Sequence, residues 1–257
     1  MAVFRTGGVD LASQDAGTGL AEIAWQIDDL GAVTAQVHAV ALRGTNEQIV
    51  ELAGRVALLG IDSPLGWPVA FQDLLTAQRT GTVEPETVLA AMREKRLTHR
   101  LTDHEVHRLT KLWPLSVSAD LIAYPAMRAA ALLAMVERAG HPVSRSGIGS
   151  VVVECYPAAA LKRWGLKMIG AKKKDGVTAE LFAQLRDATP WLSWAPGTTD
   201  LCARSHDALD AVIVALVAGA AVLGRTMPPR PGQLAAAAVE GWVHLPDEDF
   251  LARPEPA

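Results

Sequence analysis

The sequence predicts an α/β protein, built on a mixed five-stranded sheet with helices on its faces. Short apolar runs of strand length alternate with longer segments that have the periodicity of helices. One of those segments, residues 205–224, is apolar on almost every side, as in a helix that fills a core. Half of the 257 residues are hydrophobic, which favours one folded domain over residues 1–257.

The first part of the chain predicts an antiparallel meander followed by a helix. Three strand-like runs are separated by polar turns, and the DDLG turn before the third run is typical of a hairpin. The expected strands are residues 4–10, 20–26 and 34–42. Thr45 and Gln48 form a capping-box pattern, which predicts a helix over residues 45–55.

The middle of the chain predicts two buried strands with a helical insertion between them. Residues 56–62, VALLGID, form a continuous apolar run that suits a strand buried on both faces, and the prolines that follow end it. Residues 69–141 are polar-mixed and helical in pattern, so we expect them to be the insertion. The second buried strand is expected over residues 148–155. Helices over 157–165 and 177–192 and a short strand over 240–246 complete the expected elements.

Acidic residues stand at the ends of three predicted strands and on the apolar helix. The strand-end acids are Asp10, Asp62 and Glu154, and the helix carries Asp207 and Asp210. Because functional groups gather at the carboxyl ends of parallel strands, we expect these carboxylates to converge. Carboxylates in one small volume repel each other, and an oxygen-only ligand set without histidine or cysteine points to Mg²⁺ or Mn²⁺. Two such ions can activate a water and stabilise the leaving oxygen of a phosphodiester.

Each acid also has an ordinary structural explanation. Asp10 and Asp62 can be strand-end or turn residues, and Asp207 can serve the dipole of its helix. Glu154 can pair with a lysine of the cluster at residues 162–174. Asp210 is the least ordinary, because it precedes fourteen residues without a charge and a buried carboxylate is costly unless it is paired or binds a cation.

Six stretches of the chain resemble the DUF429 family (domain of unknown function), which is described as predicted nucleases of RNase H-like fold. The stretches are GVDLA at 8–12, GIDSPLGWP at 60–68, RLTD at 100–103, VVECYPAA at 152–159, HDALDAVIVAL at 206–216 and EGWVHLP at 240–246. The resemblance spans nearly the whole chain in the same order. It implies a sheet of strand order 3-2-1-4-5 in which strand 2 is antiparallel, with the insertion between strands 4 and 5.

A more distant similarity to Holliday-junction resolvases implies a metal-ligand role for four of the acids. They are Asp10, Asp62, Asp207 and Asp210. Asp62 stands where resolvases have a glutamate, which gives it a shorter reach. Glu154 lies outside the resolvase pattern, so its catalytic role rests on the resemblance to the DUF429 motif alone.

A nucleic-acid partner must be held by a local basic patch, because the net charge of the chain is −4. Arg100 and Asp103 in the insertion are candidate substrate contacts, and solvent exposure on a helix face is the alternative. Lys172, Lys173 and Lys174 are candidate contacts to a phosphate backbone, although such a run is also common in solvated loops.

These features together predict a metal-dependent nuclease that hydrolyses phosphodiester bonds of RNA or DNA. A phosphotransferase of the sugar-kinase and actin type is one alternative, since GVDLASQDAGTG faintly resembles its first phosphate loop. A non-catalytic binding protein that keeps the fold is the other. We expect a cytoplasmic location, because the two cysteines are far apart, the N-terminus lacks the apolar run of a signal peptide, and residues 205–224 are too short and acidic to span a membrane.

Overall fold

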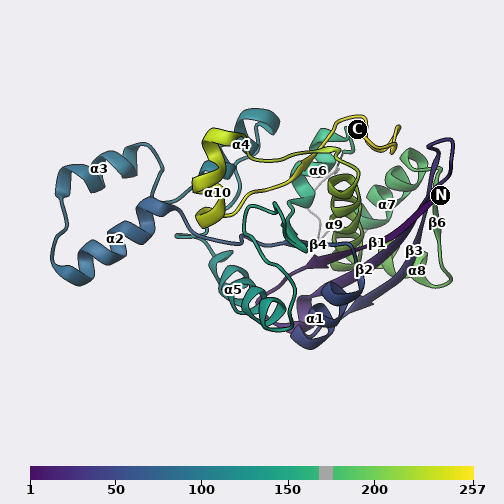
Figure 1. Cartoon of the computed structure of the whole chain (residues 1–257), viewed down its shortest axis with the longest axis horizontal. Coiled ribbons are helices and arrows are strands. Elements are labelled where there is room, and N and C mark those ends of the chain that lie inside the picture. Colours follow the sequence, from purple (N-terminus) through teal and green to yellow (C-terminus); the bar gives the residue numbers. More distant parts are fainter. Residues whose placement is uncertain (168–175) are drawn as a thin grey trace.

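The computed structural model describes residues 1–167 and 176–257 of the chain. A mixed sheet of six strands in the order β5-β4-β1-β2-β3-β6 runs through the centre of the molecule (Figure 1). The strands are β1 (Ala2–Asp10), β2 (Gly19–Ile27), β3 (Val33–Leu42), β4 (Leu58–Asp62), β5 (Val152–Glu154) and β6 (Leu192–Trp194). Strand β2 is antiparallel to β1 and β3, whereas the β1–β4, β4–β5 and β3–β6 pairs are parallel.

The expected five-stranded sheet is wrong by one strand, because β6 adds to the free edge of β3. Residues 177–192 were expected to be one helix, but the helix ends at Ala188 and the chain turns into β6. The strand expected at 148–155 is also shorter, since Gly147 and Gly149 have positive φ and form turns before it. The short strand expected at 240–246 is confined to β8 (Leu245–Pro246), which pairs with β7 (Thr226–Met227) outside the main sheet.

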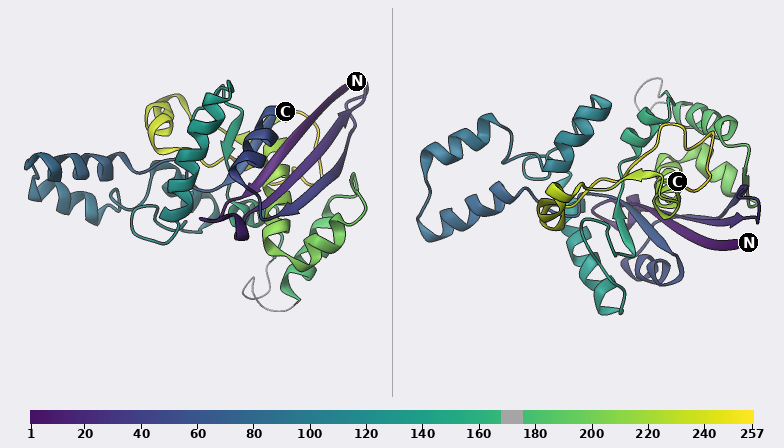
Figure 2. Two further views of the ribbon diagram at one scale, coloured as in Figure 1. Left: turned by 90° about the horizontal axis from the view of Figure 1, so that it is seen from below. Right: turned by 45° about the horizontal axis from the view of Figure 1, so that its top comes forward.

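The described residues contain ten α-helices. They are α1 (Asn46–Arg55), α2 (Val69–Thr80), α3 (Pro85–Arg93), α4 (Leu101–Thr110), α5 (Ala123–Arg138), α6 (Pro157–Arg163), α7 (Val177–Ala188), α8 (Thr198–Arg204), α9 (His206–Val222) and α10 (Leu234–Glu240). Helices α1 and α5 cover one face of the sheet, and α9 covers the other together with α6, α7 and α8 (Figure 2). The sheet is therefore buried on both faces, as the apolar β4 run predicts.

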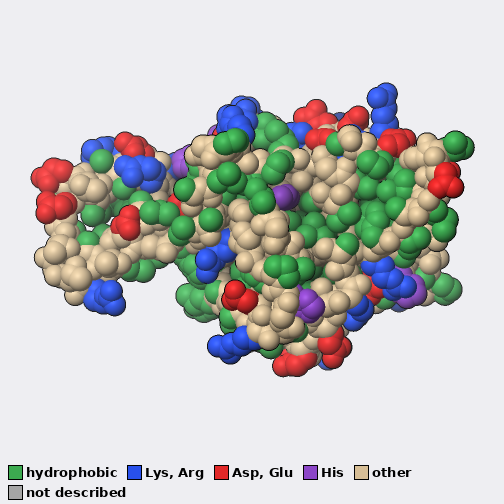
Figure 3. Space-filling view, viewed as in Figure 1, with side chains coloured by type: hydrophobic (Ala, Val, Ile, Leu, Met, Phe, Trp, Pro, Cys, Tyr) green, Lys and Arg blue, Asp and Glu red, His purple; other side chains and the backbone are tan. Residues whose placement is uncertain are grey.

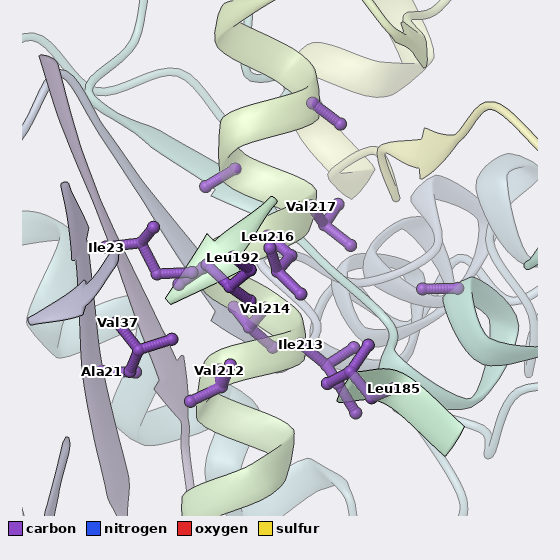
Figure 4. Packing of buried hydrophobic residues seen from close by; sticks show 14 of the residues in the cluster. Ala21, Ile23, Val37, Leu185, Leu192, Val212, Ile213, Val214, Leu216 and Val217 are labelled. Carbon is purple, nitrogen blue, oxygen red and sulfur yellow. The ribbon is translucent and has the colours of Figure 1, made fainter. Parts of the chain in front are cut away.

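Helix α9 is the centre of the larger core. Every residue from Ala208 to Ala220 is buried, and the helix lies between the sheet and α7 (Figure 4). Its close approach requires glycine in the strands below it, because a Cβ on Gly8 would collide with the Ala211 carbonyl and one on Gly60 would lie 2.6 Å from Val214 Cγ1. The apolar helix predicted over residues 205–224 is thus the core helix of the molecule.

The residues between β4 and β5 are helical, but they do not form one unit. Helices α2 and α3 project from the body as a separate arm, while α4 lies beside α10 at the edge of the sheet (Figure 1). Helix α5 returns to the sheet and packs beside α1, where Leu132 and Val136 are fully buried. The insertion therefore contributes an arm, an edge cover and a core helix.

Across the described segments, no single helix is long and apolar enough to cross a membrane. Only α8 and α9 taken together pass that test, and they are bent by 114° at the break between them.

Candidate active site at the carboxyl ends of β1 and β4

Two of the predicted acids are direct neighbours across a pair of parallel strands. Asp10 ends β1 and Asp62 ends β4, and the two residues are register partners. Neighbouring strands lie about 4.8 Å apart, so the two backbones are that close at the edge of the sheet. Both residues are half-buried. The ends of the two strands therefore lie side by side, and the convergence of their carboxylates stays a prediction.

Both side chains lie on the face of the sheet that α9 covers. Gly8 and Gly60 approach α9 directly. Side chains alternate between faces along a strand, so Asp10 and Asp62, two residues further on, share that face. Strand geometry thus aims both carboxylates toward the helix that carries the other two aspartates.

Helix α9 begins above this pair. It runs antiparallel to β1. At its start, Asp207 approaches Gly19, which is the register partner of Asp10. Two turns later, Ala215 lies over Gly8 and accepts a hydrogen bond from Thr6. Thr6 Oγ1 donates to the Ala215 carbonyl over 2.9 Å. The first turn of α9 therefore sits at the acidic end of the sheet, where its dipole favours anionic groups.

Asp210 is positioned over β4 by the same packing. It lies one turn before Val214, which contacts Gly60, and Asp62 lies two residues beyond Gly60. Four helical residues advance about 6 Å and two strand residues about 6.6 Å, so the backbone of Asp210 lies at the level of Asp62. Asp210 is only 4 % exposed, while Asp207 is 26 % exposed and contacts His206 Nε2 at 2.9 Å.

The side chains do not form a metal-ligand set as they stand. Within residues 1–167 and 176–257, no group of three or more histidine, cysteine, aspartate and glutamate side chains is arranged to hold a metal ion. The fold therefore brings Asp10, Asp62 and the start of α9 to one place, and the metal site expected there stays a prediction.

A cleft opens beside Asp62, with a cavity volume of about 160 Å³. Its floor is formed where β4 and β5 end, by Asp62, Ser63 and Tyr156. Its other wall comes from the connection between α4 and α5, which includes Leu115 and Ile122. The insertion thus covers the acidic edge of the sheet and leaves a pocket under the cover.

Glu154 ends β5 beside Asp62 and is held by hydrogen bonds to the insertion. Its side chain is 3 % exposed and accepts two hydrogen bonds from Arg100, at 2.8 Å and 2.7 Å. The backbone N–H of Leu65 donates a third at 2.9 Å. The cation that pairs with Glu154 is therefore Arg100 of the insertion, in place of the lysine of the 162–174 cluster that was the alternative. These hydrogen bonds join β5 to the insertion, and the catalytic role expected for Glu154 stays a prediction.

Arg100 and Asp103 line the same cleft and are bound to each other, so their expected role as substrate contacts stays a prediction. Asp103 accepts from Arg100 Nε and Nη2 at 3.1 Å and 2.9 Å, and the Glu240 carbonyl accepts from Nη1 at 3.1 Å. With the two bonds to Glu154, all five N–H groups of Arg100 are used within the chain. Burial lowers the pKa of Arg100, but Asp103 and Glu154 outweigh it and the net shift is upward. The arginine therefore stays charged and has no N–H left for a phosphate.

The C-terminal EGWVHLP stretch lies beside the hydrogen-bond network of Arg100, Asp103 and Glu154 and contributes to it. The sequence did not predict this role. Glu240 accepts from the backbone N–H of Val69 at 2.8 Å and of Leu101 at 2.7 Å, which begin α2 and α4. Gly241 has φ of 89°, and a Cβ there would lie 2.6 Å from Glu154 Oε2. One carboxylate thus caps two helices of the insertion beside the Arg100–Glu154 pair.

The two cysteines offer no nucleophile. Burial raises the pKa of the Cys155 thiol, and the nearby charges of Asp62 and Glu154 raise it further. Burial alone raises the pKa of Cys202 to about 12. Neither thiol is therefore activated for chemistry. Lys172, Lys173 and Lys174, the predicted phosphate contacts, lie outside the described residues.

Comparison with known proteins gives one match. A family model described as "Protein of unknown function (DUF429)" matches residues 8–233. No curated protein and no solved structure matches the chain.

Proposed function

Because the chain belongs to the DUF429 family, whose description assigns no activity, we propose its function from the acidic edge of the sheet. The protein acts as a metal-dependent nuclease on an RNase H-like fold. Asp10 and Asp62 hold Mg²⁺ or Mn²⁺, and Asp210 and Asp207 complete the site from α9. The substrate is nucleic acid, whose phosphodiester bond is hydrolysed by water.

The register pairing of Asp10 with Asp62 is the observation that carries this proposal. Two carboxylates on adjacent parallel strands repel each other, and a divalent cation between them offsets that repulsion. Mg²⁺ commonly takes only one or two protein carboxylates and completes its octahedron with waters and substrate phosphates. A pair of acids with a third on the facing helix fits that requirement without a full cage of protein ligands.

The donor chemistry fits this group of ions, since all four candidate side chains offer carboxylate oxygens. When bound, the ion lowers the pKa of a water and neutralises charge on the departing oxygen. Helix α9 buries Asp210 against the sheet, and the insertion forms one wall of the cleft beside Asp62. Asp207 holds the His206 imidazole at the outer rim.

The topology supports the RNase H-like assignment. Strand β1 lies between the antiparallel β2 and the parallel β4, and the last long helix crosses the sheet to bring acids to the end of β1. The Lys172–Lys174 run remains the candidate contact for the phosphate backbone, because Arg100 and Asp103 are engaged internally.

Divalent-dependent cleavage of labelled RNA, single-stranded DNA, duplex DNA and branched DNA tests the proposal. Asp10→Asn, Asp62→Asn and Asp210→Asn are each expected to lower the rate by about 100-fold or more, since a metal contributes several kcal/mol and each 1.36 kcal/mol is tenfold. Asp187→Asn, an exposed acid on α7, is the matched control and keeps full activity.

Cleavage that survives in all three site variants would contradict a nuclease at this edge. Absence of cleavage together with heat protection by ATP and Mg²⁺ would favour the phosphotransferase instead. Absence of both cleavage and divalent-ion binding would favour a binding protein without catalysis.

A further inference from the structure

The projecting arm of α2 and α3 has almost no core of its own. No residue of α2 is buried, and Ala91 is the single buried residue of α3. Helix α5, by contrast, buries five residues. Isolated helices of twelve and nine residues are marginal in water, because most of the stability of a helix in a protein comes from packing of its apolar face. The arm therefore lacks the packing that holds α5 in place.

The apolar side chains of the arm are left open on two sides. A groove with a volume of about 220 Å³ lies between the two helices, and Leu74 and Val88 are among the residues that line it (Figure 3). On the side of α3 that faces away from the groove, Leu89 is 53 % exposed and Met92 is 60 % exposed. Both faces of the arm thus offer apolar surface to a partner.

The outward face of α3 carries an acid, an apolar residue and a base in one stripe. Glu86, Leu89 and Arg93 are three and four residues apart, so they share one face of the helix. Ala91, which lines the groove, lies on the opposite face. Glu86 and Arg93 are both exposed, and neither forms an ion pair with another described residue. Each end of the stripe therefore has a charge available for a partner.

The charges of the arm do not favour nucleic acid as that partner. Residues 69–96 contain four acidic and four basic residues, so the arm has no excess of positive charge to attract a phosphate backbone. A stripe with an acid at one end and a base at the other is instead complementary to a reversed copy of itself. Such a self-complementary surface is what a two-fold contact between identical chains requires.

The spacing of the stripe fits an antiparallel pair of α3 helices. If two copies cross at Leu89, Glu86 of each lies within about 1.5 Å, measured along the helix axis, of Arg93 of the other. The two Leu89 side chains then meet at the centre, with Met92 beside them. The helix dipole also favours an acid at the start and a base at the end of α3, but it requires no apolar side chains between them.

We propose that the arm binds the arm of a second copy of this chain, through an antiparallel two-fold contact between their α3 helices. The inference goes beyond the proposed nuclease and does not depend on it. The surface of one short helix is smaller than the roughly 800 Å² per partner of a standard interface, so the dimer is expected to form weakly, at micromolar concentrations.

Sedimentation of the whole chain over a series of concentrations tests the contact without relying on cleavage. The wild type is expected to pass from monomer to dimer. Leu89→Glu places two like charges at the centre of the contact and should raise the Kd about 100-fold. Leu30→Glu is the matched control, because this leucine is 95 % exposed in the turn between β2 and β3, and it should leave the Kd unchanged. Both leucines are exposed, so thermal unfolding should match the wild type in both variants.

Charge reversal tests the direction of the pairing. Glu86→Arg and Arg93→Glu should each raise the Kd about tenfold, because each brings like charges together twice in the dimer. The double variant restores both pairs and should return the Kd to within about threefold of the wild type. An equimolar mixture of the two single variants should form a heterodimer, since each then supplies the charge that the other needs. Damage to α3 itself would not be reversed in this way.

Three results would overturn the inference. A wild-type protein that stays monomeric up to about 1 mM has no such contact. A dimer that Leu89→Glu leaves intact, or that charge reversal weakens without recovery in the double variant and the mixture, is not formed by antiparallel α3 helices. A complex that forms only when RNA or DNA is added, and that Arg93→Glu abolishes, would make nucleic acid the partner of the arm. Cleavage or its absence bears on the proposed nuclease and on none of these results.

Discussion

Two groups of acids lie at the same edge of the sheet and differ in how deeply they are buried. Glu154 and Asp103 are buried, and Arg100 neutralises both with a complete set of hydrogen bonds. Asp10 and Asp62 are half-buried and face each other across adjacent strands. The first group is paired with the guanidinium of Arg100. At the second group we propose a divalent metal ion.

The comparison teaches that position at a strand end does not decide the role of an acid. Asp62 and Glu154 end neighbouring parallel strands, and Ile61 pairs with Glu154 in register. Glu154 is the one to which the insertion delivers Arg100. On the face shown in Figure 3, acidic and basic side chains are interspersed over the projecting arm.

Removing the arginine should have the largest effect. Arg100→Met leaves Glu154 and Asp103 as buried charges without their partner, and we expect a loss of about 3–5 kcal/mol in the free energy of unfolding. Urea denaturation measures it. Arg108→Met on the same helix removes an arginine that is 56 % exposed and should cost no more than about 0.5 kcal/mol. Equal losses in the two variants would erase the distinction between the groups.

Displacing α9 should disturb the aspartates and leave the Arg100 network in place. A Cβ on Gly8 collides with the Ala211 backbone, so Gly8→Ala should cost about 3 kcal/mol and also reduce cleavage. Gly232→Ala is the control, because a Cβ there meets open space and should change stability by less than about 0.5 kcal/mol. Unchanged stability in Gly8→Ala would contradict the close packing of α9 on β1.

Neutralising one acid from each group compares them directly. Glu154→Gln weakens a buried charged pair and should cost about 2 kcal/mol. Asp62→Asn removes repulsion with Asp10 at a half-buried site, so its stability should stay within about 0.5 kcal/mol of wild type while cleavage falls. Thermal unfolding and the cleavage assay give both readouts. The opposite ranking of stabilities would assign the structural role to Asp62.

The smallest effect is a pH dependence at the edge of the Arg100 network. His244 donates its backbone N–H to the Glu154 carbonyl at 2.9 Å, and burial lowers the pKa of its imidazole, which the hydrogen bond with the Ser146 carbonyl partly offsets. The folded protein therefore binds this proton less readily than the unfolded chain. Stability should be full above about pH 6.5 and fall as the pH drops toward the folded pKa, by up to about 1.4 kcal/mol per pH unit.

Urea titrations between pH 5 and 8, the range in which histidine charge changes, measure this slope. His244→Gln should flatten it, and His38→Gln, at an exposed position of β3, should leave it as in wild type. A slope that persists in His244→Gln would show that another group carries it.

The sequence predicted helices and strands correctly wherever the local pattern was strong. The apolar run before Asp62 and the capping box at Thr45 and Gln48 correspond to β4 and α1 as built. It missed β6 because a strand of three residues has too few positions to show alternation. The sequence predicted a single insertion over residues 69–141, because the helical pattern of the projecting arm is the same as that of α5, which packs on the sheet.

The chain by itself determined that residues 206–222 form a buried helix carrying two acids, and that acids end β1, β4 and β5. Hydrophobic periodicity and the residues that end a strand are local properties, which can be read directly from a sequence. Only the tertiary structure decided which acid meets Arg100, because that arginine lies 54 residues before Glu154 and its partners include the Glu240 carbonyl, 140 residues further along. Electrostatic pairing depends on distance in space, and no local pattern encodes that distance.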